Sequence, residues 1–279
     1  MAFYGGTFTR LHVDRIKELL SAVSSYLKEG LFKSIRVSTR PDALDPGCLQ
    51  VMKTYGVTTV ELGAQSMDNH VLSLSRRGHT AEDTVGAVER LRRSGFKVGV
   101  QLMPGLPGDD EETFRVTITK TIRLNPDMVR LYPAVVIQGT EMADMYRQGR
   151  YQPMDVGEAV QICSEACMRL EDKSIPVIRM GLMSSPSLLL KGQIVAGPWH
   201  PAFGFLVRST VHHRRLEPTL PRSGVSSTVI VAAPQREIPL VKGFKNQGLK
   251  WIEKRIGAKV VRVEPDDSVL PGRIRVRRV

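Results

Sequence analysis

Polar residues and glycines gather at the ends of five short apolar runs of the chain. These run ends read YGGT from residue 4, STRPD from residue 38, ELGAQS from residue 61, QLMPGLPG from residue 101 and RLYP from residue 130. Glycines let a ligand approach the backbone closely, and Ser38, Glu61, Gln65 and Gln101 offer hydrogen-bond donors and acceptors to a polar ligand. Any one run end is better explained as an ordinary loop, but five of them together favour a binding site.

The runs that carry these residues have the composition of β-strands, and amphipathic stretches with helical spacing lie between them. We expect strands at Ala2–Tyr4, Ile35–Ser38, Thr58–Leu62, Lys97–Leu102, Met128–Tyr132 and Val177–Met180. Helices are expected within residues 11–27, 81–95 and 155–173, the second of them opened by a capping box from Thr80 to Asp83 and ended by Gly95. Alternating strands and helices predict a parallel sheet or barrel that binds ligands at the carboxyl ends of its strands.

Length and composition limit the classes of protein to consider. The 279 residues, 42% of them hydrophobic, can form the core of one large domain or two smaller ones. No apolar run approaches the roughly 18–20 residues of a membrane span, and the first residues lack the basic start and apolar stretch of a secretion signal. Three cysteines are too few for a disulfide scaffold and fit a reducing compartment. We therefore predict a cytoplasmic protein.

Positive charge is concentrated in the last part of the chain. Residues 201–279 contain 16 Lys and Arg residues but only 6 Asp and Glu residues, and the net charge of the whole chain is +12. Such an excess favours contact with polyanions, most commonly nucleic acid, although a solvated basic surface is the alternative. The stretches 258–264 and 272–278 alternate apolar and basic residues, which predicts a sheet with one basic face.

Several motifs, in this order, resemble the radical S-adenosylmethionine (SAM) superfamily. They read AFYGGTFT, VSTRPD, TTVELGAQSMDNHVLSLSRRGHT, GFKVGVQLMPGLPGDD and PDMVRLYP. The resemblance is strongest to the bacterial group that is similar to the radical-SAM portion of the elongator catalytic subunit, and oxygen-independent coproporphyrinogen oxidases are more distant. It covers most of the chain but is poor over residues 206–240.

The resemblance implies a partial (β/α)6, TIM-like barrel that lacks its first strand, over residues 1–205. A small basic α+β module would follow over residues 206–279. Within it, residues 208–243 look loop-rich apart from a strand in STVIVAA, and residues 243–257 predict a helix with Leu249, Ile252 and Ile256 on one side. The elongator-like resemblance makes tRNA or another RNA the expected ligand of this basic module.

The resemblance also implies the residues that bind SAM. The backbone of Gly5, Gly6 and Thr7 would contact the amino group, because carbonyl oxygens suit an ammonium group. Arg77 would bind the carboxylate through its guanidinium fork. The remaining implied contacts are Ser38 and Arg40 at the ribose or methionine portion, Gln65 and Ser66 near the same moiety or the substrate, Gln101 at the same rim, and Met103 near the adenine.

Members of this family bind a [4Fe–4S] cluster through a C-x3-C-x2-C loop after their first strand, and the cluster cleaves SAM to a radical. This chain has no such motif: Cys48 is isolated, and Cys163 and Cys167 lie one helical turn apart, which predicts core positions. His200 and the adjacent His212 and His213 are likewise expected to pack or lie at the surface, so no metal ligands are predicted. We expect a truncated radical SAM protein that is inactive alone. The alternative is a non-catalytic protein that binds nucleic acid, or a pseudoenzyme that binds SAM.

Overall fold

The chain forms two compact units. The computed structural model describes residues 1–5, 7–186, 188–221 and 227–279. Unit 1 comprises Met1–Ala159 and Arg169–Trp199, and unit 2 comprises Val160–Met168 and His200–Val279.

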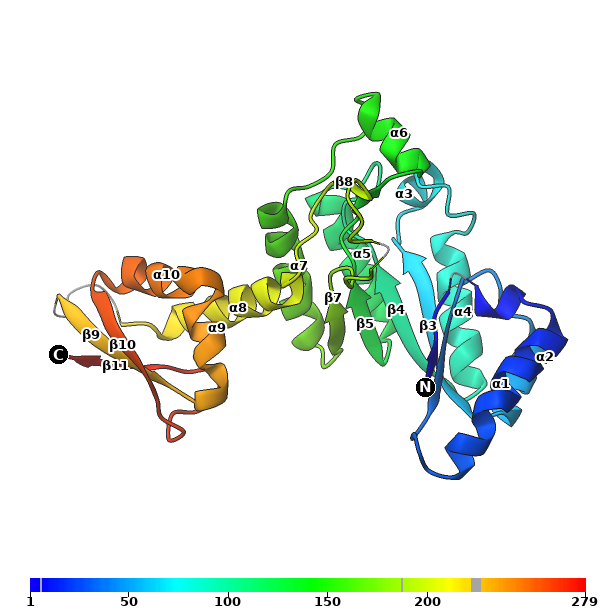
Figure 1. The fold of residues 1–279 in the computed structure, drawn as a ribbon, viewed down its shortest axis with the longest axis horizontal. Helices are drawn as coiled ribbons and strands as arrows, with labels where there is room; N and C mark the ends of the chain where they lie inside the picture. Colours follow the sequence, from blue (N-terminus) through cyan, green and yellow to red (C-terminus); the bar gives the residue numbers. More distant parts are fainter. Residues whose placement is uncertain (6, 187, 222–226) are drawn as a thin grey trace. The chain divides into compact units, whose positions relative to one another are not determined.

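Unit 1 is built on a sheet of six parallel strands. In spatial order these are β1 (Ala2–Phe3), β2 (Ile35–Thr39), β3 (Val57–Gln65), β4 (Lys97–Leu102), β5 (Met128–Leu131) and β7 (Val177–Met180). The sheet curls into part of a TIM-like barrel, so the predicted fold class is confirmed (Figure 1). All six predicted strands are present, and β3 extends further than expected because its pairing with β4 contains an irregularity between Leu62 and Gln65.

Helices follow most of the strands. They are the 3₁₀ helix Phe8–Arg10, α1 (Val13–Lys28), α2 (Pro46–Thr54), α3 (Asn69–Leu74), α4 (Ala81–Arg93), α5 (Glu111–Leu124), α6 (Glu141–Arg147) and α7 (Val156–Glu171). The expected capping box at the start of α4 is confirmed between Thr80 and Asp83, and Gly95 follows the helix with a φ of +80°. A small antiparallel pair, β6 (Val136–Ile137) and β8 (Ile194–Ala196), completes the unit.

The two faces of the six-stranded sheet differ in chemistry because side chains alternate along each strand. In β4, Val98, Val100 and Leu102 are buried, whereas Gly99 and Gln101 occupy the alternate positions. Helices α2 and α4 pack against β3, and α4 also packs against β4. The apolar alternate positions therefore form the core of unit 1, and the polar ones remain available to line a cavity.

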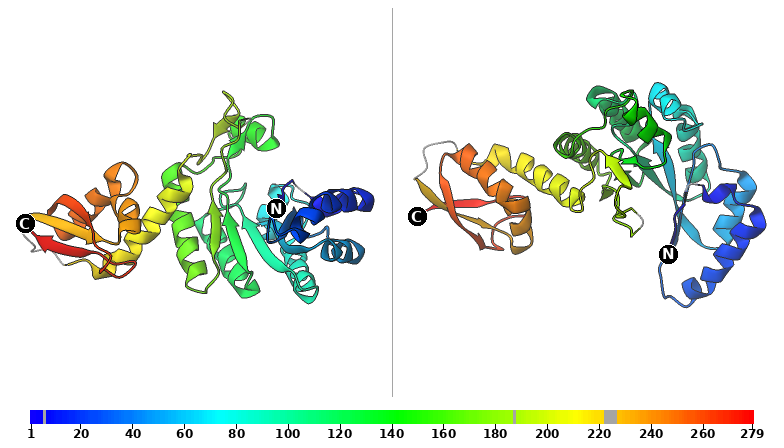
Figure 2. Two further views of the ribbon diagram at one scale, coloured as in Figure 1. Left: turned by 60° about the horizontal axis from the view of Figure 1, so that its bottom comes forward. Right: turned by 45° about the horizontal axis from the view of Figure 1, so that its top comes forward.

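The described part of unit 2 combines the middle of α7 (Val160–Met168) and three further helices with a three-stranded sheet. Its elements are α8 (Phe203–Leu216), β9 (Thr228–Ala233), α9 (Ile238–Lys242), α10 (Gln247–Ile256), β10 (Lys259–Pro265) and β11 (Arg275–Arg278), with short 3₁₀ helices at Glu217–Thr219, Gln235–Glu237 and Phe244–Asn246. Strand β9 lies in the middle, parallel to β10 and antiparallel to β11. Figure 2 shows the helices beside this sheet, and Val229, Val231, Ile252 and Ile256 form the core between them.

The expectation of a loop-rich segment from residue 208 is wrong, because α8 continues to Leu216. The helix is held by Phe203, Val207 and Val211, which are buried and follow one another every four residues. Within the described residues, no helix combines the length and the apolar character that crossing a bilayer requires.

Candidate cofactor site

A cavity of about 430 Å³ lies at the carboxyl ends of the unit 1 strands. Every strand of the sheet contributes to it, either at its last residues or in the segment that follows. The lining residues are Tyr4, Gly5, Ser38, Thr39, Arg40, Glu61, Leu62, Gly63, Gln65, Arg77, Gln101, Met103, Arg130, Tyr132, Arg179, Leu182 and Met183.

Most of the predicted cofactor-binding residues meet at this cavity. Those that line it are Gly5, Ser38, Arg40, Gln65, Arg77, Gln101 and Met103. Thr7 and Ser66 are not among the lining residues, and the Ser66 hydroxyl lies 3.3 Å from the Thr117 hydroxyl while it accepts the Asp68 N–H at 3.1 Å. Gly6 lies outside the described residues.

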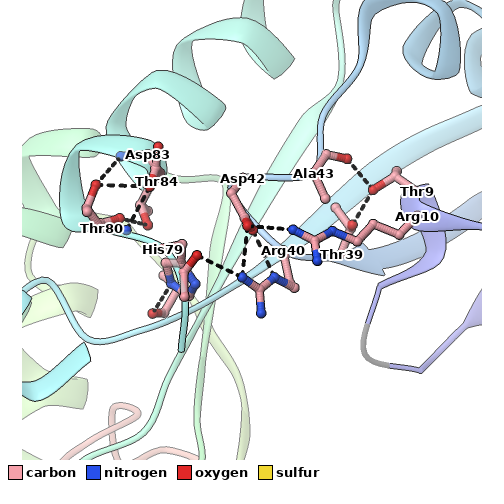
Figure 3. Close-up of polar contacts among 12 residues, drawn as sticks. Thr9, Arg10, Thr39, Arg40, Asp42, Ala43, His79, Thr80, Asp83 and Thr84 are labelled. Atoms are coloured by element: carbon pink, nitrogen blue, oxygen red, sulfur yellow. Dashed lines mark hydrogen bonds and ion pairs between the residues drawn. The ribbon is translucent and has the colours of Figure 1, made fainter. Parts of the chain in front are cut away.

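The Arg40 guanidinium is held by the protein itself. It donates two hydrogen bonds to Asp42, from Nε at 2.9 Å and from Nη2 at 2.8 Å, and a third to the Gly78 carbonyl at 3.0 Å (Figure 3). Asp42 also accepts a hydrogen bond from Arg10 at 2.8 Å, and the hydrogen bond from Arg40 holds its pKa below the usual range. The charge of Arg40 is therefore balanced within the chain.

Arg77 lines the same cavity, and no carboxylate in the described part of the chain balances its charge. Its Nε atom is buried and has no hydrogen-bond partner, and its guanidinium forms no ion pair with the described part of the chain. Burial, and then the positive charge of Arg40, lower the pKa of Arg77. A partly buried cation is normally paired, so this position suits the anionic group of a ligand.

A second charged cluster forms on the polar face of the sheet. One oxygen of Glu61 accepts a hydrogen bond from Arg36 at 2.5 Å and forms an ion pair with Arg130 at 2.9 Å, and Arg130 donates a hydrogen bond to the Tyr4 hydroxyl at 2.7 Å. Glu61 and Arg130 are both buried, at 4% and 7% exposure. Gly99 leaves room for this cluster, since a Cβ atom there would lie 2.9 Å from Glu61 Cγ.

Gln65 is held in an unusual backbone conformation at the end of β3. Its φ is +69°, in the left-handed region that non-glycine residues rarely adopt. The Gln65 side chain accepts a hydrogen bond from Gln101 Nε2 at 3.1 Å, and its carbonyl accepts the Met103 N–H at 2.8 Å. Such conformations persist where the surrounding structure fixes them, often at functional sites.

Sequence reasoning missed part of the cavity wall. Arg179, Leu182 and Met183 line it although β7 offered no polar run end. The register shows what could have revealed Arg179, because it pairs with Arg130 of β5, which in turn pairs with Gln101 of β4. The polar residue within an otherwise apolar VIRM strand was the available signal.

The cavity fits SAM, whereas the cysteines of the chain do not fit a cluster. Its volume lies within the range of small-molecule sites, and Arg77 presents an unpartnered cation for a carboxylate. All three thiols are buried and none lines the cavity, and burial raises the pKa of Cys48 and Cys163. Cys163 and Cys167 belong to unit 2. Within the described ranges, no set of three His, Cys, Asp or Glu residues could hold a metal ion.

Three known proteins show what the chain is similar to. A tRNA uridine(34) acetyltransferase of Methanocaldococcus jannaschii is 41% identical over 133 residues, which are 47% of this chain and 25% of that protein. Elongator complex protein 3 of Homo sapiens is 30% identical over 178 residues, 57% of this chain and 32% of that protein. The structure of Methanocaldococcus infernus Elp3 with an N-terminal deletion superimposes with a TM-score of 0.65 at 28% identity, over 76% of this chain and 53% of that one.

The chain thus spans between a quarter and about half of the length of these relatives. Residues 1–120 match the family model of the Radical SAM superfamily, and residues 126–213 match that of the Radical_SAM C-terminal domain. With two of its models covering most of the sequence in succession, the chain belongs to the radical SAM superfamily.

Proposed function

We propose that the chain binds SAM in the unit 1 cavity, as part of a radical SAM protein that modifies tRNA. The observation that carries the proposal is Arg77, a partly buried cation at the cavity whose Nε has no partner in the described chain. The carboxylate of SAM would supply the missing acceptor, and a guanidinium can bind it through two parallel hydrogen bonds.

The other cavity residues would position the rest of the molecule. Gly5 would offer its backbone carbonyl to the ammonium group of SAM. Gln65 and Gln101, already joined to each other, would bind hydroxyl or amino groups of the ligand. Ser38 and Arg40 are proposed at the ribose or methionine portion, and Met103 at the adenine.

In this family, SAM bound to a [4Fe–4S] cluster supplies a radical that attacks the substrate. The three buried thiols of this chain cannot hold such a cluster in the family's manner. We therefore propose that the chain binds SAM without cleaving it when it acts alone. That property is shared by the alternative function, a SAM-binding protein that is not a catalyst.

The proposed substrate is tRNA, and the proposed location is the cytoplasm. Support for tRNA comes from the names of the relatives, which include a tRNA uridine(34) acetyltransferase, and from the excess of basic residues after residue 200. Support for the cytoplasm comes from the small number of cysteines, three in the chain, which fits a reducing compartment.

The test is isothermal titration of SAM into the full chain and into two single variants. Arg77→Gln should weaken SAM binding at least ten-fold, because a charge-assisted hydrogen bond contributes about 1.5–3 kcal/mol. Arg76→Gln is the matched control, because Arg76 is exposed and pairs with Glu141 at 2.8 Å. Equal affinities for the two variants, or no SAM binding by the wild-type chain, would contradict the proposal.

A further inference from the structure

The unit 1 cavity carries more positive charge than the proposed SAM site uses. Besides Arg77, two further arginines, Arg130 and Arg179, line it, and Glu61 is the one carboxylate among the described lining residues. Arg40 is already balanced within the chain. SAM cannot neutralise the remainder, because its sulfonium and ammonium groups outweigh its single carboxylate. The cavity therefore suits a second, anionic ligand.

The pairing of two neighbouring strands places two of these cations side by side. Arg130 of β5 is paired in register with Arg179 of β7, and neighbouring strands lie about 4.8 Å apart. Both side chains line the cavity, so they lie on the same face of the sheet. Like charges at directly paired positions destabilise a sheet, and an anion bound between them would offset this repulsion.

Arg130 is buried, at 7% exposure, but its guanidinium is not fully bonded. Its Nη2 atom donates to the Tyr4 hydroxyl at 2.7 Å and lies 2.9 Å from Glu61, a carboxylate that also pairs with Arg36. Its Nη1 atom makes a long contact of 3.4 Å with the Tyr132 hydroxyl, and its Nε atom is buried without a hydrogen-bond partner in the described chain. Buried polar atoms are nearly always bonded, so this nitrogen points to a ligand.

Arg179 supplies a cation that a ligand can reach from solvent. The residue is exposed, and it forms no ion pair with the described part of the chain. Its Nη1 atom lies 3.4 Å from the sulfur of Met183, which also lines the cavity. A thioether is a weak acceptor and carries no charge, so the positive charge of Arg179 is not balanced by this contact.

We propose that Arg130 and Arg179 bind a phosphate group of an RNA substrate at the side of the cavity formed by β5 and β7. This inference deepens the proposed function and rests on its choice of RNA as the substrate. A phosphodiester is anionic, and its oxygens accept paired hydrogen bonds from guanidinium groups. Tyr4, which lines the cavity and is 58% exposed, adds an aromatic ring of the kind on which unpaired bases stack. Arg77 remains for the carboxylate of SAM.

The test follows the side-chain Nε–H NMR signals of the arginines in the isotopically labelled full chain. The Arg130 signal is assigned by its loss in Arg130→Lys. Three probes are titrated at constant ionic strength: a uridine trinucleotide without terminal phosphates, its uncharged methylphosphonate analogue, and sodium phosphate. Each titration is run with and without SAM, so the series without SAM reports on the phosphate site whether or not SAM binds.

The test variant is Arg179→Gln, which should fold because Arg179 is exposed and its side chain contacts Met183 alone among the described hydrogen-bond partners. The matched control is Arg123→Gln. It removes the same charge from an exposed position of α5 and leaves the cavity lining intact. Arg179→Lys keeps the charge but not the guanidinium fork, so its loss of affinity should be smaller than that of Arg179→Gln.

We expect the trinucleotide to shift the Arg130 signal saturably in the wild type and in Arg123→Gln. Arg179→Gln should bind it about ten-fold more weakly, because a hydrogen bond to a charged group is lost, and the methylphosphonate analogue should lose a similar factor in the wild type.

The proposal is overturned if the trinucleotide does not move the signal, if the uncharged analogue binds equally well, or if Arg179→Gln and Arg123→Gln respond alike. A response to sodium phosphate without one to the trinucleotide would refute RNA as the ligand. A chain that shows the expected trinucleotide response but binds no SAM would support this site while contradicting the proposed SAM site.

Discussion

Asp109 carries a carboxyl group that the fold buries in the loop after β4. One of its oxygens accepts the Gly105 N–H at 2.9 Å, and the other is buried without a partner in the described chain. Burial raises the pKa of Asp109 to about 7, against the opposing effect of the Gly105 hydrogen bond. The same loop is held by Tyr151, whose hydroxyl donates to the Gly105 carbonyl at 2.6 Å. The carboxyl group is thus neutral in the folded protein at mildly acidic pH.

This shift predicts how stability depends on pH. The folded state holds the Asp109 proton up to about pH 7, whereas the unfolded chain releases it near pH 4. The contribution of Asp109 to the free energy of unfolding therefore falls as pH rises between these two values. Asp109→Asn should remove this slope and stabilise the protein at pH 8 by on the order of 3 kcal/mol. Urea unfolding at pH 5 and pH 8 measures both effects.

The neighbouring Asp110 provides a control of opposite sign. It caps α5 by accepting the Thr113 N–H at 2.8 Å, and that backbone hydrogen bond holds the pKa of Asp110 below its usual range. Its contribution is present above the unfolded pKa and is lost as pH falls. Asp110→Asn should therefore cost stability at pH 8, and a gain at that pH from both variants would show that the burial of Asp109 is not the cause.

At the scale of elements, two glycines predict opposite responses to the same change. Gly99 lies in β4 beside Glu61, and a Cβ atom there would lie 2.9 Å from Glu61 Cγ and 3.2 Å from Met128 Cγ. Because two arginines hold Glu61, Gly99→Ala should cost about 1–3 kcal/mol of stability. Gly86 lies inside α4 with nothing within 4 Å of an added Cβ atom, so Gly86→Ala should gain about 0.5–1 kcal/mol.

Chemical unfolding of the two alanine variants measures the difference. Equal stability of Gly99→Ala and the wild type would show that Glu61 can leave its arginine partners without cost. A loss in Gly86→Ala would show instead that α4 does not tolerate the methyl group that the structure leaves room for.

The strands were predictable from sequence because each is a short, mostly apolar run between amphipathic stretches, and β4 also alternates with a period of two, as Val98, Gly99, Val100 and Gln101 show. Other features depend on tertiary contacts that no short pattern records. The left-handed Gln65 needs the irregular pairing of β3 and β4. The difference between Arg40 and Arg77 went unnoticed, although Asp42 stands only two residues after Arg40 and no carboxylate stands as near to Arg77 in the sequence. The error over α8 was avoidable, because its apolar residues stand at helical spacing.

For the molecule as a whole, the cysteines predict the outcome of cluster reconstitution. Cys48 lies in unit 1, and Cys163 and Cys167 lie in unit 2, all buried. Treatment of the chain with iron and sulfide under anaerobic conditions should therefore give no stoichiometric [4Fe–4S] cluster and no reductive cleavage of SAM. Iron analysis, visible absorption and detection of 5′-deoxyadenosine check this. A stoichiometric cluster with SAM cleavage would refute the expectation, and replacing Cys48 by serine would then test which unit supplies the thiolates.

The charge of unit 2 predicts how the chain should bind tRNA. Several of its arginines are neutralised locally, since Arg262 and Arg277 pair with Glu264, and Arg275 pairs with Asp266. Lys250 and Lys254 are exposed one turn apart on α10, so they are the better candidates for phosphate contacts. Even two such contacts should weaken binding of a tRNA transcript about ten-fold between 50 and 200 mM salt, because bound phosphates release counterions.

Fluorescence anisotropy with a labelled tRNA transcript, repeated over this salt range, measures the slope of affinity against salt. Lys250→Gln/Lys254→Gln should reduce affinity and flatten the slope by about 1–2, whereas Arg262→Gln, which removes a cation already paired with Glu264, should change both less. An affinity that does not respond to salt would exclude phosphate contacts as the basis of binding. A steep slope that the Lys250→Gln/Lys254→Gln variant does not alter would show that residues outside α10 contact the RNA phosphates. The experiment therefore distinguishes binding through α10 from binding through the other basic residues of unit 2.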